Sequence, residues 1–391
     1  MNKLEATVNT DNAVNALVQR RIRPDVRAMH AYVVQDASGM VKLDAMENPF
    51  ALPLELQHAL GERLGAVALN RYPGARVDVL RKALEAYVDL PPGCALMLGN
   101  GSDELINLLS IACHQPHGDP HGDVNADSRA VVLAPEPGFV MYAMSAQLTG
   151  LRYVGVPLTP DFALDVPAMC AAIAEHRPAL IYLAYPNNPT ANLWDADAVQ
   201  AVVDAAAQTQ SLVVIDEAYQ PFSSRTYLDV MRARPQDTAH VVLMRTLSKF
   251  GLAGVRLGYM LGQAALVAEI DKVRPPYNVS VLNCECALFA LEHPQVFAAQ
   301  ALAICAERAR LQAAFSALPG ITTWPSDGNM ILLRVAGDVQ RAPAVFEALK
   351  ARGVLIKNVS KMHPLLAGCL RVTVGSAEEN DRLLSALKEV L

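Results

Sequence analysis

The sequence predicts an α/β protein in which a mainly parallel central sheet is flanked by helices and is joined to a smaller α+β domain. Two patterns predict this class. From about residue 80 to residue 285, short apolar runs of strand-like composition alternate with segments of helical periodicity, which is typical of a parallel sheet with helices on both faces. After residue 285, a long alanine-rich helical segment precedes separate strands, which indicates a second unit.

Each predicted element follows from its local pattern. Residues 1–30 are polar and predict an arm outside the core. The apolar runs predict strands at residues 130–133, 180–184, 212–215 and 241–244, and the segment 195–208 predicts a helix. The C-terminal part predicts a helix over residues 286–318, strands over 330–335, 354–357 and 369–374, and a last helix that opens at the capping-box spacing of Ser376 and Glu379.

The chain has 391 residues, of which 52% are hydrophobic and 18% are charged, so it has enough apolar surface for a large core. At roughly 150 residues per domain, this length predicts two or three domains. We expect residues 1–45 to form an N-terminal arm and part of the small domain. Residues 46–285 would form the large domain, and residues 286–391 the small C-terminal domain.

The formal net charge of −6 argues against a nucleic acid or an anionic membrane as a partner. The N-terminal residues lack the apolar segment of a signal peptide, and no run approaches the roughly 18 apolar residues of a membrane span. The seven cysteines include no C-x-x-C pair, so we expect reduced thiols in a cytoplasmic protein. The histidine-rich segment 114–128 predicts a solvated loop rather than a metal site, because no regular element would hold the ligands in place.

In a parallel sheet, ligands bind at the carboxyl ends of the strands, so the residues that follow each run are candidate site residues. Gly99–Glu104 is a glycine-rich turn before an apolar helix, and it is either a phosphate site or an ordinary capped helix start. Tyr185–Thr190, with two asparagines between prolines, is a rigid turn. Asp216 ends a buried strand, where an isolated carboxylate is costly and needs a cationic partner.

Lys249 follows the next strand, and two interpretations are open for it. It is either a surface lysine at a turn or a partly desolvated amine whose lowered pKa allows a Schiff base with an aldehyde. In the second case Thr246, Ser248 and Arg256 would bind the phosphate of the same ligand. An acid for a pyridinium nitrogen, a lysine 33 residues later and a phosphate cup together indicate pyridoxal phosphate as the cofactor.

A wider set of motifs carries a resemblance to a known family; they are Leu43–Pro49, Arg71–Pro73, Gly99–Glu104, Tyr185–Thr190, Val214–Tyr219 and Thr246–Tyr259. These motifs resemble the fold-type I, class II pyridoxal-phosphate-dependent aminotransferases, and among them the histidinol-phosphate aminotransferase family. The resemblance extends from about Tyr32 to the end of the chain. It implies an aspartate aminotransferase-like fold with a large domain that binds pyridoxal phosphate.

The resemblance also implies a role for each matching residue. Lys249 would bind the cofactor and move the substrate's α-proton, Asp216 would pair with the ring nitrogen, and Tyr219 with Asn188 would bind the phenolic oxygen. Phe139 stands where the family usually has a tyrosine ring over the pyridine. The phosphate would be bound by Gly101, Ser102, Asp103, Thr246, Ser248 and Arg256, together with Tyr72 of the neighbouring subunit of a homodimer.

For substrate binding, the resemblance implies Tyr32, Asn48, Asn188, Lys357 and Arg371. A phosphate dianion needs more than one cation or donor, and Lys357 with Arg371 would supply two. The family more often has an arginine at position 357, so a bidentate contact would become a point charge here. Met46 also departs from the family's usual asparagine.

The activity that the resemblance implies is transamination of L-histidinol phosphate with 2-oxoglutarate, which gives imidazole acetol phosphate and L-glutamate in histidine biosynthesis. A related aromatic amino acid aminotransferase or a threonine-phosphate decarboxylase would share the cofactor motifs. A non-catalytic regulatory module that binds pyridoxal phosphate is a further alternative, although the thirty polar N-terminal residues are too short for its usual DNA-binding domain. A non-catalytic nucleotide-binding protein would lack the yellow chromophore.

Overall fold

The computed structural model describes residues 13–29, 31, 35–114 and 129–391. The chain divides into two units, residues 1–38 and residues 39–391. In the described part of the first unit, residues 13–21 are helical and a short helix, α2 (Pro24–Arg27), follows. The second unit contains the sheets and the candidate site residues that the structure describes.

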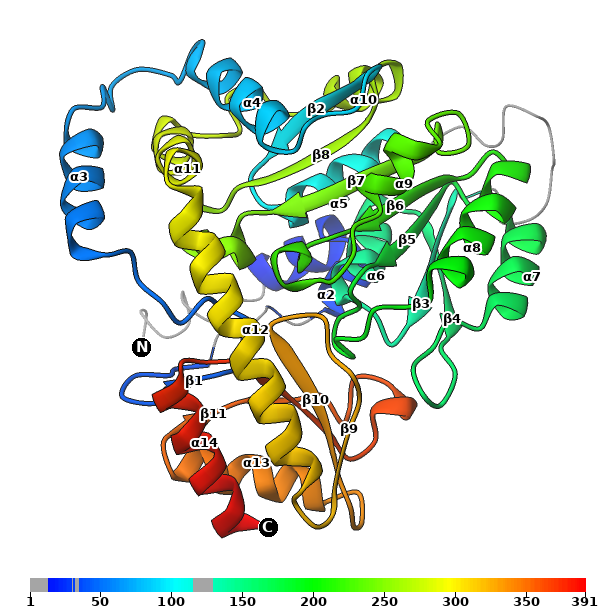
Figure 1. The fold of residues 1–391 in the computed structure, drawn as a ribbon. Helices are drawn as coiled ribbons and strands as arrows, with labels where there is room; N and C mark the ends of the chain where they lie inside the picture. Colours follow the sequence, from blue (N-terminus) through cyan, green and yellow to red (C-terminus); the bar gives the residue numbers. More distant parts are fainter. Residues whose placement is uncertain (1–12, 30, 32–34, 115–128) are drawn as a thin grey trace, which may run out of the picture. The chain divides into compact units, whose positions relative to one another are not determined.

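A seven-stranded sheet lies at the centre of the second unit, in the order β2-β8-β7-β6-β5-β3-β4 (Figure 1). The pairs β3–β4, β3–β5, β5–β6 and β6–β7 are parallel, whereas β8 is antiparallel to both β7 and β2. The prediction of a mainly parallel sheet is therefore confirmed. The strands are β2 (Cys94–Gly99), β3 (Val131–Glu136), β4 (Arg152–Pro157), β5 (Leu180–Ala184), β6 (Leu212–Asp216), β7 (Val241–Thr246) and β8 (Gly258–Gln263).

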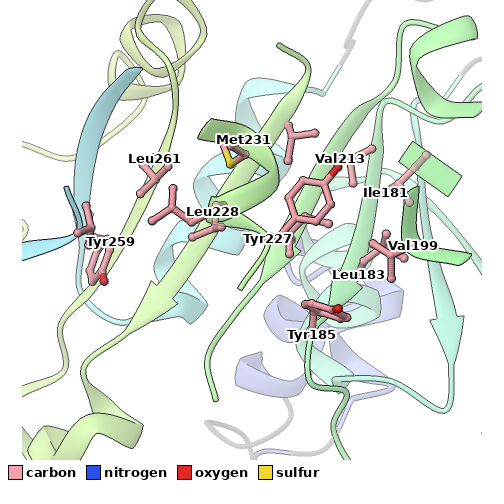
Figure 2. Close-up of a cluster of buried hydrophobic side chains, with 14 of the residues drawn as sticks. Ile181, Leu183, Tyr185, Val199, Val213, Tyr227, Leu228, Met231, Tyr259 and Leu261 are labelled. Carbon is pink, nitrogen blue, oxygen red and sulfur yellow. The ribbon is translucent and has the colours of Figure 1, made fainter. Parts of the chain in front are cut away.

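Helices cover both faces of this sheet. Because consecutive residues of a strand point to opposite sides, each central strand presents apolar side chains to both layers of helices. In β6, Val213 and Ile215 belong to one hydrophobic cluster and Val214 to the other. Figure 2 shows the first cluster, where Val213 and Ile181 of the sheet lie near Val199 of a covering helix. The helices of this region are α3 (Leu54–Gly65), α4 (Arg76–Tyr87), α5 (Ser102–Ala112), α6 (Val140–Thr149), α7 (Val166–His176), α8 (Ala196–Gln208), α9 (Leu228–Ala233) and α10 (Ala264–Asp271).

The C-terminal part forms a four-stranded antiparallel sheet in the order β12-β13-β10-β9. A separate parallel pair joins β1 (Val41–Lys42) to β11 (Val354–Leu355), so segments near both ends of the chain meet. This pairing agrees with a small domain built from both chain ends, although the three-part division itself stays a prediction. The other elements are α11 (Val281–Glu292), α12 (Pro294–Ser316), α13 (Arg341–Ala351), α14 (Ala377–Val390), β9 (Ile321–Thr323), β10 (Met330–Val335), β12 (Lys357–Asn358) and β13 (Cys369–Thr373).

Two predicted C-terminal elements differ from the structure. The single helix over residues 286–318 is wrong: α11 and α12 are separate helices that meet at 79°, with Pro294 in the first turn of α12. Proline is favourable in a first turn but has no N–H with which to continue a preceding helix. The single strand over residues 354–357 is also divided, because β11 and β12 belong to different sheets. The capping box of Ser376 and Glu379 is confirmed at the start of α14.

Short helical turns complete the second unit: η1 (Gln220–Phe222), η2 (Ser248–Leu252), η3 (Ala253–Val255) and η4 (Pro364–Leu366). Helix α12 contacts η1. It also packs along β9, β10 and α14 (Figure 1). Within the described ranges, no single helix is long and apolar enough to cross a membrane; α11 and α12 would meet that criterion only as a bent pair. The same ranges hold no group of three His, Cys, Asp or Glu residues arranged to bind a metal ion, and residues 115–128 of the histidine-rich segment lie outside them.

Candidate active site

A cavity lies at the carboxyl ends of the central strands, beside the first turns of α5 and α6. It encloses about 570 Å³ outside the protein atoms, part of which is open to solvent. The parallel sheet brings the ends of β5, β6 and β7 to this edge, which is where the sequence placed the candidate residues. The lining residues are Met46, Ser102, Asp103, Phe139, Tyr142, Ala184, Pro186, Asn188, Asp216, Ala218, Tyr219, Thr246, Ser248, Lys249 and Arg256.

Asp216 is the last residue of β6 and is only 4% exposed. Its Oδ2 accepts a hydrogen bond of 2.7 Å from the Tyr142 hydroxyl, and its Oδ1 accepts one of 3.0 Å from the Ala218 N–H. Burial raises the pKa of Asp216 to about 6, although both hydrogen bonds oppose the shift. Within the part of the chain that the structure describes, no basic side chain forms an ion pair with this carboxylate. The site therefore fits a ligand that brings its own positive charge.

Lys249 lies in η2, directly after β7, and its Nζ donates a hydrogen bond of 2.9 Å to the Ala45 carbonyl. Burial lowers the pKa of this amine to about 8, and the positive charges of Arg371 and Arg256 act in the same direction. A lysine with a lowered pKa is more often neutral and therefore nucleophilic near physiological pH. This environment agrees with the predicted desolvated amine and excludes a freely solvated surface lysine.

An anion-binding cup lies on one side of the cavity, at the N-terminus of α5. Gly101 has a φ of +82°, and a Cβ there would lie 2.9 Å from the Arg256 guanidinium. Arg256 donates to the Ser248 hydroxyl at 3.2 Å and to an Asp103 carboxylate oxygen at 3.3 Å, and the Thr246 hydroxyl donates to Ser248 at 3.0 Å. Because backbone N–H groups at a helix N-terminus attract anions, this group of donors fits a phosphate.

Phe139, Asn188 and Tyr219 are three further residues that line the cavity. Phe139 precedes α6, and its ring meets that of Tyr142 edge-on at 5.6 Å. Asn188 accepts a hydrogen bond of 2.7 Å from Arg371 through its side-chain oxygen. Tyr219 is buried, which raises the pKa of its hydroxyl, while the nearby Arg371 opposes that rise. An aromatic ring, an amide and a phenol therefore line the same cavity as Asp216 and Lys249.

The predicted substrate residues lie at different places. Arg371 of β13 is buried and donates a hydrogen bond of 2.8 Å to the Asp44 carbonyl. Lys357 of β12 is half-buried and stands opposite Arg371 in the antiparallel register, so the two cations share one face of the sheet. Asn48 does not line the cavity; its amide donates to Gln300 at 2.9 Å. Tyr32 lies outside the described residues.

Tyr72 is also not one of the residues that line the cavity. Its side chain is 76% exposed and its ring stacks on that of Tyr277, with 4.3 Å between centroids. The roles of Tyr72, Asn48, Lys357 and Arg371 stay predictions, as do the individual roles of the lining residues.

The sequence interpretation did not single out Tyr142, the hydrogen-bond donor to Asp216. A signal for it was present, because Tyr142 follows Phe139, the residue that precedes α6, by three residues, and the two rings meet edge-on. It also did not single out the backbone groups of Ala45 and Ala218. Backbone partners of this kind leave no trace in residue type, so no sequence pattern could have identified them.

Comparison with known proteins adds to this geometry. Residues 38–387 match the model of the family described as aminotransferase class I and II. The chain is 64% identical over 383 residues to histidinol-phosphate aminotransferase of Paracidovorax citrulli (98% of this chain and 100% of that protein) and 64% identical over 372 residues to the protein of that name in Methylibium petroleiphilum (95% of each). The crystal structure of histidinol-phosphate aminotransferase from Sinorhizobium meliloti in complex with pyridoxal-5'-phosphate is similar at a TM-score of 0.79 and 25% identity, over 95% of this chain and 97% of that one.

Proposed function

Because the chain belongs to the class I and II aminotransferases, which use pyridoxal phosphate, we propose that it transfers the amino group of L-histidinol phosphate to 2-oxoglutarate. The products are imidazole acetol phosphate and L-glutamate, and the reaction belongs to histidine biosynthesis. The observation that carries the proposal is one cavity that combines an acid without a cationic partner among the described residues, a buried amine and a cup of hydrogen-bond donors. Relatives 64% identical over nearly the full chain support the substrate.

The residues of the cavity fit the cofactor. Bound pyridoxal phosphate supplies an aldehyde that combines with amino groups and a pyridinium ring that withdraws electrons from the substrate's α-carbon. Asp216 would hold a proton on the ring nitrogen, because its buried carboxylate lacks any other cation among the described residues. Phe139 would cover one face of the ring, and Asn188 with Tyr219 would bind its phenolic oxygen. Gly101, Ser102, Asp103, Thr246, Ser248 and Arg256 would hold the phosphate in the cup, where hydrogen bonds already join several of them.

Lys249 moves the proton that the reaction requires. Its Nζ takes the proton from the α-carbon of the substrate and later returns it, as a general base and then a general acid. A pKa of about 8 suits this role, since the amine exchanges a proton readily near neutral pH. The Ala45 carbonyl holds Nζ in place at 2.9 Å, which keeps the amine at one position on the cavity wall.

Arg371 and Lys357 bind the phosphate of histidinol phosphate. Two cations on one face of the C-terminal sheet match a dianion better than the single arginine that would suffice for a carboxylate. Arg371 also donates to Asn188, so the substrate side and the cofactor side are joined by one hydrogen bond. Tyr32 and Asn48 also bind the substrate.

The active unit is a homodimer in the cytoplasm. An exposed aromatic pair, Tyr72 with Tyr277, supports a subunit contact, because large aromatic residues are enriched at interfaces. In that dimer Tyr72 reaches the cofactor phosphate of the neighbouring subunit, and each site contains residues of both chains. The acidic net charge of −6 agrees with small-molecule partners rather than nucleic acid or membranes.

Incubation of the cofactor-loaded enzyme with histidinol phosphate and 2-oxoglutarate tests the function through the formation of glutamate. We expect rapid turnover with histidinol phosphate and at least about tenfold lower kcat/KM with histidinol, because the missing phosphate removes charge-assisted hydrogen bonds. Phenylalanine and threonine phosphate serve as the substrates of the competing activities. A kcat/KM higher with phenylalanine than with histidinol phosphate, or release of carbon dioxide from threonine phosphate, would contradict the proposal.

A further inference from the structure

Tyr142 lies on α6 at the wall of the cavity and is 2% exposed. Its hydroxyl donates a hydrogen bond of 2.7 Å to Oδ2 of Asp216, 74 residues later in the chain. Burial and the neighbouring carboxylate both raise the pKa of Tyr142, so its hydroxyl stays protonated and acts as a donor. The contact is therefore a one-directional hydrogen bond from a neutral phenol to a carboxylate.

Two aromatic contacts hold the ring of Tyr142. It stacks on Tyr182 of β5, with 4.3 Å between centroids and 9° between the planes, and Phe139 meets it edge-on. The Tyr182 hydroxyl donates to the Ile106 carbonyl at 3.4 Å instead of to Asp216. The two stacked tyrosines are thus equally buried, but only Tyr142 contacts the carboxylate.

The second carboxylate oxygen of Asp216 accepts from the Ala218 N–H at 3.0 Å. Among the described residues, each oxygen therefore has one donor, and the two donors hold the carboxylate in one orientation. The other titratable groups that act on Asp216 are Asp103 of α5, Glu217 next in the chain, and the phenols of Tyr182 and Tyr219. Asp103 and Glu217 disfavour its charge, and of all these groups Tyr142 alone favours it through a side-chain hydrogen bond.

We propose that Tyr142 is a positioning residue, whose hydroxyl orients the Asp216 carboxylate toward the ring nitrogen of the cofactor and keeps it charged. The Tyr142 hydrogen bond lowers the pKa of Asp216 against the larger effect of burial. Loss of the hydroxyl leaves a less ordered carboxylate that takes up a proton at higher pH, and a protonated acid no longer attracts a pyridinium. This inference depends on the family's cofactor and not on the substrate proposed above.

The probe for the test is 4′-deoxypyridoxine 5′-phosphate, which has the ring nitrogen and the phosphate but no aldehyde for Lys249. Its Kd is measured by calorimetry across about pH 5 to 9 for the wild type, Tyr142→Phe and the matched control Tyr182→Phe. We expect Tyr142→Phe to weaken binding about tenfold near neutral pH, since a hydrogen bond to a charged group is lost, and to shift the midpoint of the pH dependence upward. Tyr182→Phe should change neither quantity; an unchanged Kd and midpoint in Tyr142→Phe would overturn the proposal.

A second comparison does not require Tyr142→Phe to fold by itself. In an Asp216→Asn background, residue 216 carries no charge. The additional change Tyr142→Phe then removes only a hydrogen bond to a neutral amide. The double variant should bind the probe with a Kd within about threefold of that of Asp216→Asn alone. In both variants, the pH dependence of the Kd that comes from titration of Asp216 should be absent. A further tenfold loss in the double variant would show that Tyr142 acts independently of Asp216 and would overturn the proposal.

Discussion

Asp216 and Glu217 are consecutive buried carboxylates, yet the fold surrounds them in opposite ways. Glu217 forms an ion pair of 2.8 Å with Arg245 and also accepts hydrogen bonds from the Thr226 hydroxyl and the Tyr227 N–H. Asp216 faces the cavity, where its donors within the described chain are neutral. Glu217 is thus paired with a cation inside the protein, whereas no basic side chain among the described residues pairs with Asp216.

This difference teaches that burial alone does not identify a functional acid. A buried carboxylate is costly unless it is paired, and the pairing with Arg245 satisfies that requirement for Glu217. Burial raises the pKa of Asp216 to about 6, and no basic side chain in the described part of the chain neutralises its charge. The comparison predicts that changes on the Asp216 side affect catalysis, and changes on the Glu217 side affect folding.

The largest expected effect is on the cavity side, at Lys249. Lys249→Ala removes the amine that binds the cofactor and moves the proton, so we expect turnover to fall by about 10⁴-fold or more. Glutamate formation and the visible absorbance of the purified protein measure it, with the exposed Lys272→Ala as the matched control. Normal multiple-turnover activity in Lys249→Ala would contradict the assignment.

The next-largest expected effect is on stability and comes from breaking the buried ion pair between Glu217 and Arg245. Glu217→Gln leaves the Arg245 guanidinium buried without its counter-charge, so we expect the free energy of unfolding to fall by about 3–5 kcal/mol. Denaturant unfolding of the cofactor-free protein measures this change. Replacing both partners with methionine should recover most of the loss, and a Glu217→Gln variant as stable as the wild type would show that the pair is not structural.

Asp216→Asn should give the converse result. The amide keeps the shape but does not hold a proton on the ring nitrogen, so we expect kcat to fall about 10²–10³-fold, in the range of other lost electrostatic contributions. Folding should persist, because no protein cation among the described residues loses its partner. Activity assays and thermal unfolding separate the two effects; a loss of stability as large as that of Glu217→Gln would remove the contrast.

The smallest effect is a pH dependence of stability. Burial raises the pKa of Asp216 from 3.8 to about 6 in the folded chain, so the folded state holds a proton that the unfolded state has released. The free energy of unfolding therefore falls by up to about 3 kcal/mol as pH rises through the window between these two values. Above that window it is constant. Unfolding of the cofactor-free wild type and of Asp216→Asn across this window measures it, and equal slopes for the two proteins would refute the prediction.

Much of the cavity was predictable because strand ends carry readable signals. The apolar runs before Asp216 and Lys249 end where β6 and β7 end, within one or two residues, and a parallel sheet brings such ends to one edge. The glycine-rich turn before α5 was readable for the same reason, and the confirmed fold and cofactor follow from these local patterns. The resemblance then added the residue roles that periodicity does not supply.

Contacts between distant segments were not predictable in this way. The sequence indicated that Asp216 needs a cation, but it did not show that Arg245 pairs with Glu217 or that Arg371 reaches Asn188. The break at Pro294 was missed because the alanine-rich pattern continues on both sides of it. Helical periodicity describes each helix but does not report the angle between two helices.

The sequence by itself determined which residues can do chemistry and at which strand ends they stand, since strand period and turn chemistry depend on near neighbours. Only the tertiary structure decided that the adjacent Glu217 pairs with Arg245 and that Tyr142, 74 residues before Asp216, donates a hydrogen bond to its carboxylate. The physical reason is that burial and charge pairing depend on the order in which strands and helices pack. That order is a property of the whole chain rather than of any local segment.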